Sequence, residues 1–234
     1  MGCAALRLAF ATTPAGAFST GPAEITLNGE TIPIESFACA PDPTFSRSSI
    51  CSRGDVVAAD GSWTWVSPVL ELDPGGSSGG TIDGQFALRN ETDATLDFTL
   101  SIRLPMTTTD AFLPDEAAIV DGTLHDEDGN GALFQSGFLQ GFYALTGSVD
   151  GAVTLGASGG SITAPPSGTA HIGSFGFRYY GPRPQSSIQL TFDFELSPHD
   201  SASFDHVYFW VVPEPGTSLL VGVGLAALAR RRSR

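Results

Sequence analysis

Two segments of the chain alternate regularly between apolar and polar residues. In the first the apolar positions are Leu96, Phe98, Leu100, Ile102 and Leu104, and in the second they are Ile188, Leu190, Phe192, Phe194 and Leu196. A period of two places successive side chains on opposite faces of a β-strand. Strands with one buried face and one wet face are typical of antiparallel sheets. We therefore expect the polar positions of the second segment to face solvent: Gln189, Thr191, Asp193 and Glu195.

Turn signals lie between further apolar segments. Asn28-Gly29 favours a two-residue hairpin turn. Pro68 interrupts the apolar segment 63–72 and indicates a bulge or an edge strand, because proline cannot donate to a sheet ladder. Residues 74–80 are rich in Gly and Ser and predict a flexible loop, which could separate an N-terminal hairpin layer from the rest.

These signals recur at intervals of roughly 8–12 residues, without an amphipathic helix longer than two turns. The pattern predicts an all-β fold, an antiparallel β-sandwich that is either immunoglobulin-like or jelly-roll-like. Composition agrees, because the 234 residues include 28 Gly, 16 Pro and 16 Phe, and a hydrophobic fraction of 41% is enough for a packed core. We expect one sandwich domain over residues 18–211.

The charge balance is strongly acidic. The chain has 25 Asp and Glu against 11 basic residues, all of them Arg, which gives a formal net charge of −14. Such a surface repels nucleic acid and anionic lipid, so we expect no nucleic-acid partner. The charge favours solubility, and it could attract divalent cations or basic partners.

Residues 1–17 resemble a weak or truncated signal peptide. They are small and apolar, but Arg7 interrupts them, and Ala15-Gly16-Ala17 resembles a cleavage site. If this segment is removed on export, Cys39 and Cys51 remain of the three cysteines. An oxidising compartment would then allow a disulfide between them, and two free thiols are the alternative.

The C-terminus combines three parts in a fixed order. Residues 212–215 read Val-Pro-Glu-Pro, residues 216–229 are uncharged and mostly apolar, and residues 230–234 contain four Arg. The two prolines exclude a helix through the motif and hold it extended. As a helix, residues 216–229 would span about 21 Å, which is shorter than a hydrocarbon core of about 30 Å. A short span with a basic cytoplasmic end suits a temporary membrane anchor.

This tail resembles the PEP-CTERM sorting signal of Gram-negative bacteria. The resemblance covers about the last two dozen residues and implies that an exosortase, a membrane protease, recognises and cuts the tail. It assigns the recognition motif to Pro213, Glu214 and Pro215, a transmembrane helix to residues 216–229, and the anchor end to Arg230, Arg231 and Arg232. An ordinary tail anchor or a hydrophobic C-terminal strand is the alternative.

The same resemblance implies a route for the protein. It implies export, a transient stage in the inner membrane, and then a location at the cell surface or outside the cell. Proteins with this tail often accompany exopolysaccharide and biofilm production, so exopolysaccharide is an expected partner. The tail does not specify what the preceding domain does.

Asp126, Asp128 and Asn130 are the candidate metal ligands. Their alternate spacing matches the first three ligands of an EF-hand loop, whose oxygen ligands suit Ca²⁺. The twelfth position is Gly137 rather than the bidentate Glu of that loop. The alternative is a solvated hairpin turn built on Asp-Gly and Asn-Gly. No other cofactor is expected.

Two histidines and four aromatic residues carry less specific signals. His199 and His206 lie seven residues apart and could share a metal ion, but we expect them at the surface or at strand ends, because no further ligand is evident. Four aromatic side chains could stack on sugar rings or pack within the sheets: Tyr179, Tyr180, Tyr208 and Trp210.

Catalytic signatures are absent from the sequence. There is neither a Gly-x-Ser-x-Gly nucleophile elbow nor a phosphate-binding loop, and we expect the protein not to be an enzyme. Asn90-Glu91-Thr92 matches a glycosylation acceptor, which we interpret as a chance match. The expected function is a structural or interaction role at the cell surface or in the extracellular matrix. A carbohydrate-binding module is the alternative, and a secreted hydrolase is a more distant one, because a sandwich can host all three.

Overall fold

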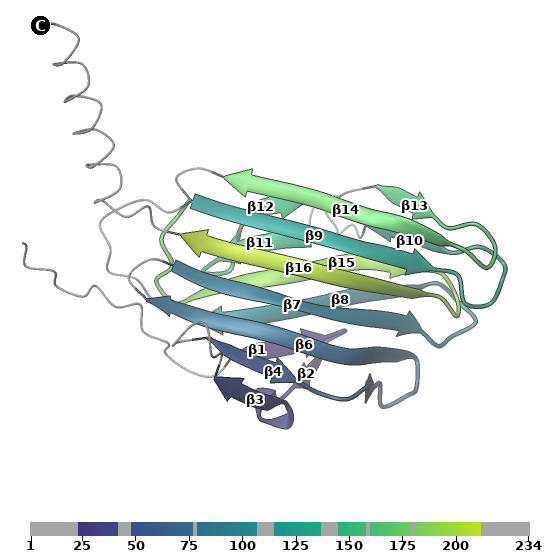
Figure 1. The fold of residues 1–234 in the computed structure, drawn as a ribbon, viewed down its shortest axis with the longest axis horizontal. Helices are drawn as coiled ribbons and strands as arrows, with labels where there is room; N and C mark the ends of the chain where they lie inside the picture. The colour runs from purple at the N-terminus through teal and green to yellow at the C-terminus, as the bar shows by residue number, and fades with distance from the viewer. Residues whose placement is uncertain are drawn as a thin grey trace, which may run out of the picture.

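The computed structural model describes residues 23–41, 48–76, 79–106, 115–136, 145–157, 160–178 and 181–211. These residues form two antiparallel sheets that pack face to face, with one 3₁₀ turn at Ile34–Ser36 and no α-helix in the described ranges (Figure 1). The predicted all-β sandwich is therefore confirmed for this part of the chain.

The sheet that faces the reader in Figure 1 is called the front sheet, and the other the back sheet. The front sheet runs in the order β14 (Thr169–Arg178), β9 (Asp115–His125), β16 (Ser201–Val211), β7 (Gly79–Asn90), β6 (Trp63–Gly76), β4 (Ser49–Ser52) and β3 (Ala38–Pro41), with β5 (Val56–Val57) paired to β6. The back sheet runs in the order β12 (Ala152–Ala157), β11 (Leu145–Val149), β15 (Ser187–Leu196), β8 (Leu96–Pro105), β1 (Glu24–Leu27) and β2 (Glu30–Ile32). Two short strands extend it, because β10 (Leu133–Ser136) also pairs with β15, and β13 (Ser161–Thr163) pairs with β10.

The strand order from β7 onward is that of a jelly roll. We count β10 and β11 as one interrupted strand, and β12 and β13 as the next, and number the eight strands from β7 as 1 to β16 as 8. The strand order is then 6-3-8-1 across the front sheet and 5-4-7-2 across the back sheet. Two interlocked Greek keys produce this order. Of the two sandwich types expected from the sequence, the described residues follow the jelly roll.

The two regularly alternating segments are neighbours in the back sheet, β8 and β15. They pair from Ser187 opposite Pro105 to Leu196 opposite Leu96, which places both apolar sets on the inner face. The prediction that the polar positions of β15 face solvent is wrong for Thr191 and Asp193, which are each only 4% exposed. The reason is local packing on that face, where the Thr191 hydroxyl lies 3.3 Å from the Ser101 hydroxyl of β8 and accepts a 3.1 Å hydrogen bond from the Gln189 amide.

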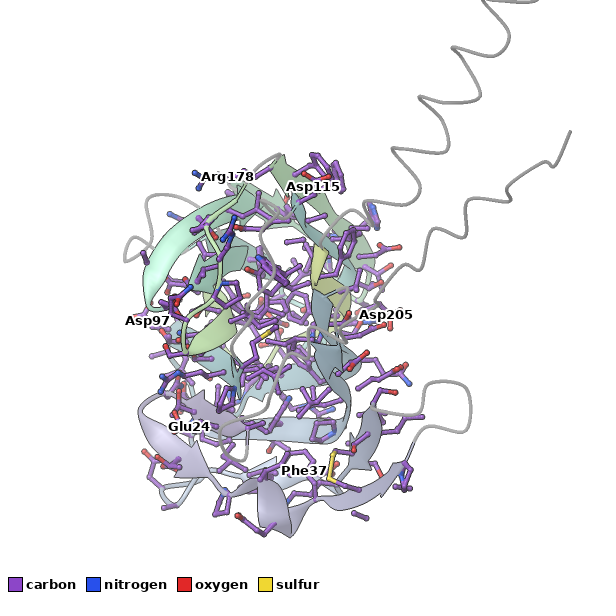
Figure 2. All side chains as sticks on the ribbon, turned by 90° about the vertical axis from the view of Figure 1, so that its left-hand side faces the viewer. Glu24, Phe37, Asp97, Asp115, Arg178 and Asp205 are labelled. Carbon is purple, nitrogen blue, oxygen red and sulfur yellow. A yellow bond between two sulfur atoms is a disulfide. The ribbon has the colours of Figure 1, made fainter. Side chains whose placement is uncertain are left out.

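The core is filled largely by aromatic rings from both sheets. The Phe194 ring stacks on Phe98 and Phe134 of its own sheet, with centroids 5.4 and 4.8 Å apart, and meets Phe204 of the front sheet at 5.3 Å. Figure 2 looks along the strands from the end at which β16 finishes and shows side chains filling the space between the layers. This cross-sheet packing supplies most of the apolar burial, which is the main stabilising contribution to such a fold.

Three turn predictions have different outcomes. Asn28 and Gly29 form the expected tight turn between β1 and β2, with φ of 50° and 81°. The expected irregularity at Pro68 is a bulge, since the pairing of β6 with β7 shifts register between Val66 and Val69. The prediction of a separating loop at residues 74–80 is wrong, because β6 continues to Gly76 and pairs there with Gly79 of β7. Both strands lie in one sheet, so nothing there divides the domain.

The predicted signal peptide, residues 1–17, and the predicted membrane helix, residues 216–229, lie outside the described residues. Within the described ranges, no helix has both the length and the apolar character needed to cross a bilayer.

Candidate functional site

The sorting tail follows directly from a central strand of the front sheet. Pro213, Glu214, Pro215 and the arginines Arg230, Arg231 and Arg232 lie outside the described residues. β16 ends at Val211, two residues before Pro213, and Val211 pairs with Gly79 of β7 on one side and with Asp115 of β9 on the other. Because β16 is hydrogen-bonded on both sides along its whole length, the motif is attached to one of the most firmly held strands of the domain.

At the opposite end of the sandwich, the predicted metal ligands belong to a cluster of three carboxylates. Asp126, Asp128 and Asp200 each place one oxygen within 4.8 Å of the others. Asp126 and Asp128 follow β9, whereas Asp200 lies in the connection between β15 and β16. Asn130 lies beside the cluster, because its side-chain amide donates a 2.6 Å hydrogen bond to Asp128.

Hydrogen bonds hold each member of this cluster in place. Asp126 accepts from the backbone amides of Gly129, at 3.1 Å, and of Ser167. Asp200 is fully buried and accepts from the Ser197 hydroxyl and from the Glu127 amide, the latter at 3.2 Å. The backbone turns tightly here, with Gly129 and Gly131 at φ of 85° and 97°, a conformation that favours glycine.

The carboxylates of this cluster differ in their readiness to ionise. Burial raises the pKa of Asp200 above its ordinary value, and the nearby charges of Asp126 and Asp128 add to this effect, although hydrogen bonds from Ser197 and Glu127 oppose it. For Asp126, burial also acts to raise the pKa, but amide hydrogen bonds from Ser167, Gly131 and Gly129 outweigh it, so the pKa is lowered. An opposing cation would relieve the repulsion at Asp200.

Three carboxylates at this separation could hold a hard cation such as Ca²⁺, which takes oxygen ligands. Calcium binding stays a prediction, and Asp200 joins Asp126, Asp128 and Asn130 as a candidate ligand. The alternative of a hairpin turn is wrong in its topology, because the segment joins β9 of the front sheet to β10 of the back sheet. Asp200 was missed because it lies more than seventy residues from Asp126, and no local spacing signals such a partner.

Cys39 and Cys51 are joined by a disulfide between adjacent strands. The residues face each other across β3 and β4, with their Cα atoms 4.0 Å apart. Figure 2 shows this bond beside Phe37, at the edge of the sandwich. The bond closes a short loop at the free edge of the front sheet, where few other contacts hold β3.

A second polar cluster is buried inside the end of the sandwich at which β16 finishes. Glu116 of β9 is fully buried, and its Oε2 accepts a 2.5 Å hydrogen bond from the Thr154 hydroxyl of the back sheet. Among the described residues, Glu116 Oε1 and the Tyr208 hydroxyl find no hydrogen-bond partner of ordinary geometry. Burial raises the pKa of Glu116, against lowering contributions from Thr154 and the positive charge of Arg178. Burial and the nearby Glu116 also raise the pKa of Tyr208.

We expect Glu116→Gln to remove part of the pH dependence of stability. The pKa of Glu116 is raised in the folded state, so folding favours the protonated carboxyl group. The contribution of this group to the free energy of unfolding is therefore fully present below the unfolded pKa and is lost as pH rises through the folded pKa. Over that interval the loss is about 1.4 kcal/mol per pH unit. The free energy of unfolding of the Gln variant, relative to the native chain, should therefore increase as pH rises from the unfolded pKa through the raised folded pKa of Glu116, as measured by urea titration over a series of pH values.

The matched control is Glu30→Gln in the exposed strand β2. Its difference from the native chain should stay constant over the same range. A Glu116→Gln variant that is equally destabilised at every pH would show instead that the carboxyl group is not the source of the pH dependence.

The histidines and aromatic residues singled out in the sequence do not form a common site. His199 contacts Asp93 at 2.8 Å, whereas His206 is buried in the core between Phe86 and Phe192, so the two histidines share no metal site. The expectation of a surface position is wrong for His206, and burial lowers its pKa to about 3. Tyr208 and Trp210 are fully buried, which assigns them to packing, and Tyr179 and Tyr180 lie outside the described residues.

A shallow groove of about 410 Å³ crosses the outer face of the front sheet. Its polar lining includes Ser67, Gln85, Asp121, Thr123, Ser203 and Asp205. Asp121 and Asp205 face each other directly across β9 and β16, so this surface carries concentrated negative charge. Hydroxyl and carboxylate groups in such a groove could accept hydrogen bonds from a polar ligand.

Comparison with known proteins identifies the tail and leaves the sandwich without a match. A family model described as the PEP-CTERM protein-sorting motif matches residues 211–233. No curated protein and no solved structure matches the chain. The matched segment begins at the last residue of β16 and includes the predicted motif, the apolar segment and the first residues of the basic end. The resemblance noted in the sequence is thus confirmed, and the C-terminal segment of this chain is a PEP-CTERM protein-sorting motif.

Proposed function

We propose that this chain is an exported protein that an exosortase processes at its C-terminal tail, and that its sandwich then serves as a structural or interaction module of the cell surface or extracellular matrix. The observation that carries the proposal is the match of residues 211–233 to the sorting motif. The motif implies export, a transient membrane-anchored stage and processing by a membrane protease.

Two features of the domain support this route. The disulfide between Cys39 and Cys51 suits an oxidising compartment outside the cytoplasm. The tail continues a doubly paired central strand, so cutting in the tail would release the domain without removing a strand from either sheet. A formal net charge of −14 would keep a released domain soluble.

The role of the released domain is the finer part of the proposal. A non-enzymatic function within exopolysaccharide or biofilm matrix follows from the association typical of the sorting family. Carbohydrate binding is the alternative, and the polar groove on the front sheet is the surface that we would test for it. The burial of Tyr208 and Trp210 weakens it, since two of the four candidate aromatic platforms are unavailable to a sugar.

The test places one tag before the sandwich and one after Arg234, in hosts with and without an exosortase. We expect the C-terminal tag to be lost only when the protease is present. Replacing Pro213, Glu214 and Pro215 together with Ala should preserve the tag, because the extended motif that the protease recognises is removed. Immunoblotting of membrane and released fractions measures both outcomes.

The matched control replaces Thr217 and Ser218 with Ala, which changes the same tail outside the motif. This variant should be cut as the native chain is. Loss of the tag without any exosortase, or a full-length product confined to the cytosolic fraction, would contradict the proposal.

A further inference from the structure

The outer face of the front sheet carries a group of exposed apolar side chains beside the end of β16. Phe175 and Phe177 of β14 are 62% and 39% exposed, and Ile119 of β9 is 39% exposed. Val207 and Phe209 of β16 are half-buried on the same face. We call these five residues the apolar patch. Soluble domains seldom leave neighbouring large apolar side chains exposed unless the surface binds something.

Strand register arranges the apolar patch in two adjacent rows. Phe175 lies opposite Ile119, which lies opposite Val207. In the next row, Phe177 and Phe209 flank the small residue Ala117. The Phe175 and Phe177 rings stack with centroids 6.2 Å apart, so the patch is one continuous surface across three strands.

The row nearer the middle of the sheet has the opposite character. Gly173, Asp121 and Asp205 occupy it, with the two carboxylates directly opposed. Figure 2 labels Asp205 on the outer side of the front sheet. Two residues along a strand correspond to about 7 Å, so acidic surface begins within about 7 Å of the apolar patch, and Asp83 of β7 lies opposite Val207 at the edge of the first row. This distance is close to the depth of about 5–10 Å to which interfacial apolar faces enter a bilayer surface.

The apolar patch is also close in sequence to the membrane-directed tail. Phe209 lies two residues before the end of β16, and the uninterrupted apolar part of the tail begins at Leu219. Leu219 follows Val211 by eight positions, so an extended chain bridges at most about 29 Å between them. A tether of this length holds the domain at a high effective concentration at the surface, so a small patch is enough for docking.

We propose that, while the tail anchors the chain, the apolar patch docks the sandwich onto the lipid surface of the same membrane. The two rows enter the interface and the row of Asp121 and Asp205 remains in water. This orientation would hold the end of β16, and with it the start of the sorting motif, against the bilayer in which a membrane protease works. The inference rests on the proposed anchoring role of the tail.

The test uses the full chain with Phe175→Trp, reconstituted into phosphatidylcholine vesicles with brominated acyl chains, which quench nearby Trp fluorescence. The native Trp63, Trp65 and Trp210 are buried and give a background that the unsubstituted chain measures. The matched control is Val57→Trp, at an exposed apolar position on β5, away from the apolar patch. Flotation of the vesicles reports anchoring by the tail independently of docking.

We expect the tryptophan introduced by Phe175→Trp to be quenched at least twofold more than the one introduced by Val57→Trp. Adding Phe177→Ser to the Phe175→Trp chain should reduce that difference, because it removes a neighbouring apolar ring from the patch. Added phosphatidylglycerol should also reduce it, because Asp121 and Asp205 lie one row away from the lipid.

Three outcomes would overturn docking. A chain that floats with equal quenching at both positions overturns docking and leaves anchoring intact, whereas a chain that does not float overturns both. Docking is likewise overturned if sedimentation shows that Phe177→Ser dissociates a dimer and the quenching difference is unchanged, since the patch would then bind a second copy.

Discussion

Phe194→Ala is expected to destabilise the sandwich by about 3–5 kcal/mol, the range for truncating a fully buried Phe. Phe194 has no exposed surface and contacts rings from three other strands: Phe98, Phe134 and Phe204. Its loss would leave a cavity between the sheets, because rings fixed on different strands cannot collapse together into the space. Urea unfolding, followed by near-ultraviolet circular dichroism, measures the change in free energy.

The matched control is Phe175→Ala, which removes the same number of atoms from a side chain that is 62% exposed. Surface substitutions away from special features usually change stability by less than about 0.5 kcal/mol, so the two alanine variants should differ clearly. Similar unfolding free energies for both variants would contradict the arrangement of the core.

Asn90→Ala is expected to cost about 3 kcal/mol, since each buried polar group left without a partner costs about 1–3 kcal/mol. Asn90 is fully buried at the end of β7. The two N–H groups of its amide are shared among the carbonyl oxygens of Ala94, Leu196 and Ser197, which lie 2.8, 3.0 and 3.0 Å from Nδ2, and its oxygen accepts from the Thr92 amide. One side chain thus ties the loop before β8 to the connection that carries Asp200.

Asn90→Asp separates the donor from the acceptor function of this side chain. It keeps the acceptor for Thr92, loses both N–H donors to the three carbonyl oxygens and buries a carboxyl group, so we expect it to be at least as destabilising as Ala. The control Asn130→Ala, at an exposed position, should have little effect. If Asn90→Ala and Asn130→Ala unfold at the same urea concentration, the role assigned to Asn90 is wrong. Asn90 is buried, and its side-chain oxygen accepts a hydrogen bond from the Thr92 amide. The Asn-Glu-Thr sequence is thus explained by its structural role in a turn.

Some features of the chain follow from residues that are consecutive in sequence. The alternation in 96–105 and 187–196 predicts two strands, because a period of two is a property of the extended backbone itself. The Asn28-Gly29 turn is likewise local, since both residues tolerate the positive φ that it requires. The sorting motif is likewise local, since its match covers the consecutive residues 211–233 and no fold is needed to assemble it.

Other features depend on strand register between distant parts of the chain. Thr191 and Asp193 are buried although they hold polar positions of β15, because parts of the chain distant in sequence, such as Ser101 of β8, pack beside that strand, and alternation cannot reveal them. His206 and Glu116 have the polarity of surface residues, yet pairing of β16 and β9 directs both side chains inward.

The sequence by itself determined that this protein ends in a sorting tail and that its body is built from antiparallel strands, because both properties reside in short-range patterns. Only the tertiary structure decided which carboxylates meet, with Asp200 joining Asp126 and Asp128, and that apolar residues of β14, β9 and β16 form one surface. The physical reason is that neighbours in a sheet are chosen by hydrogen-bond register and by burial of the whole core. Those choices bring together residues that are tens of positions apart.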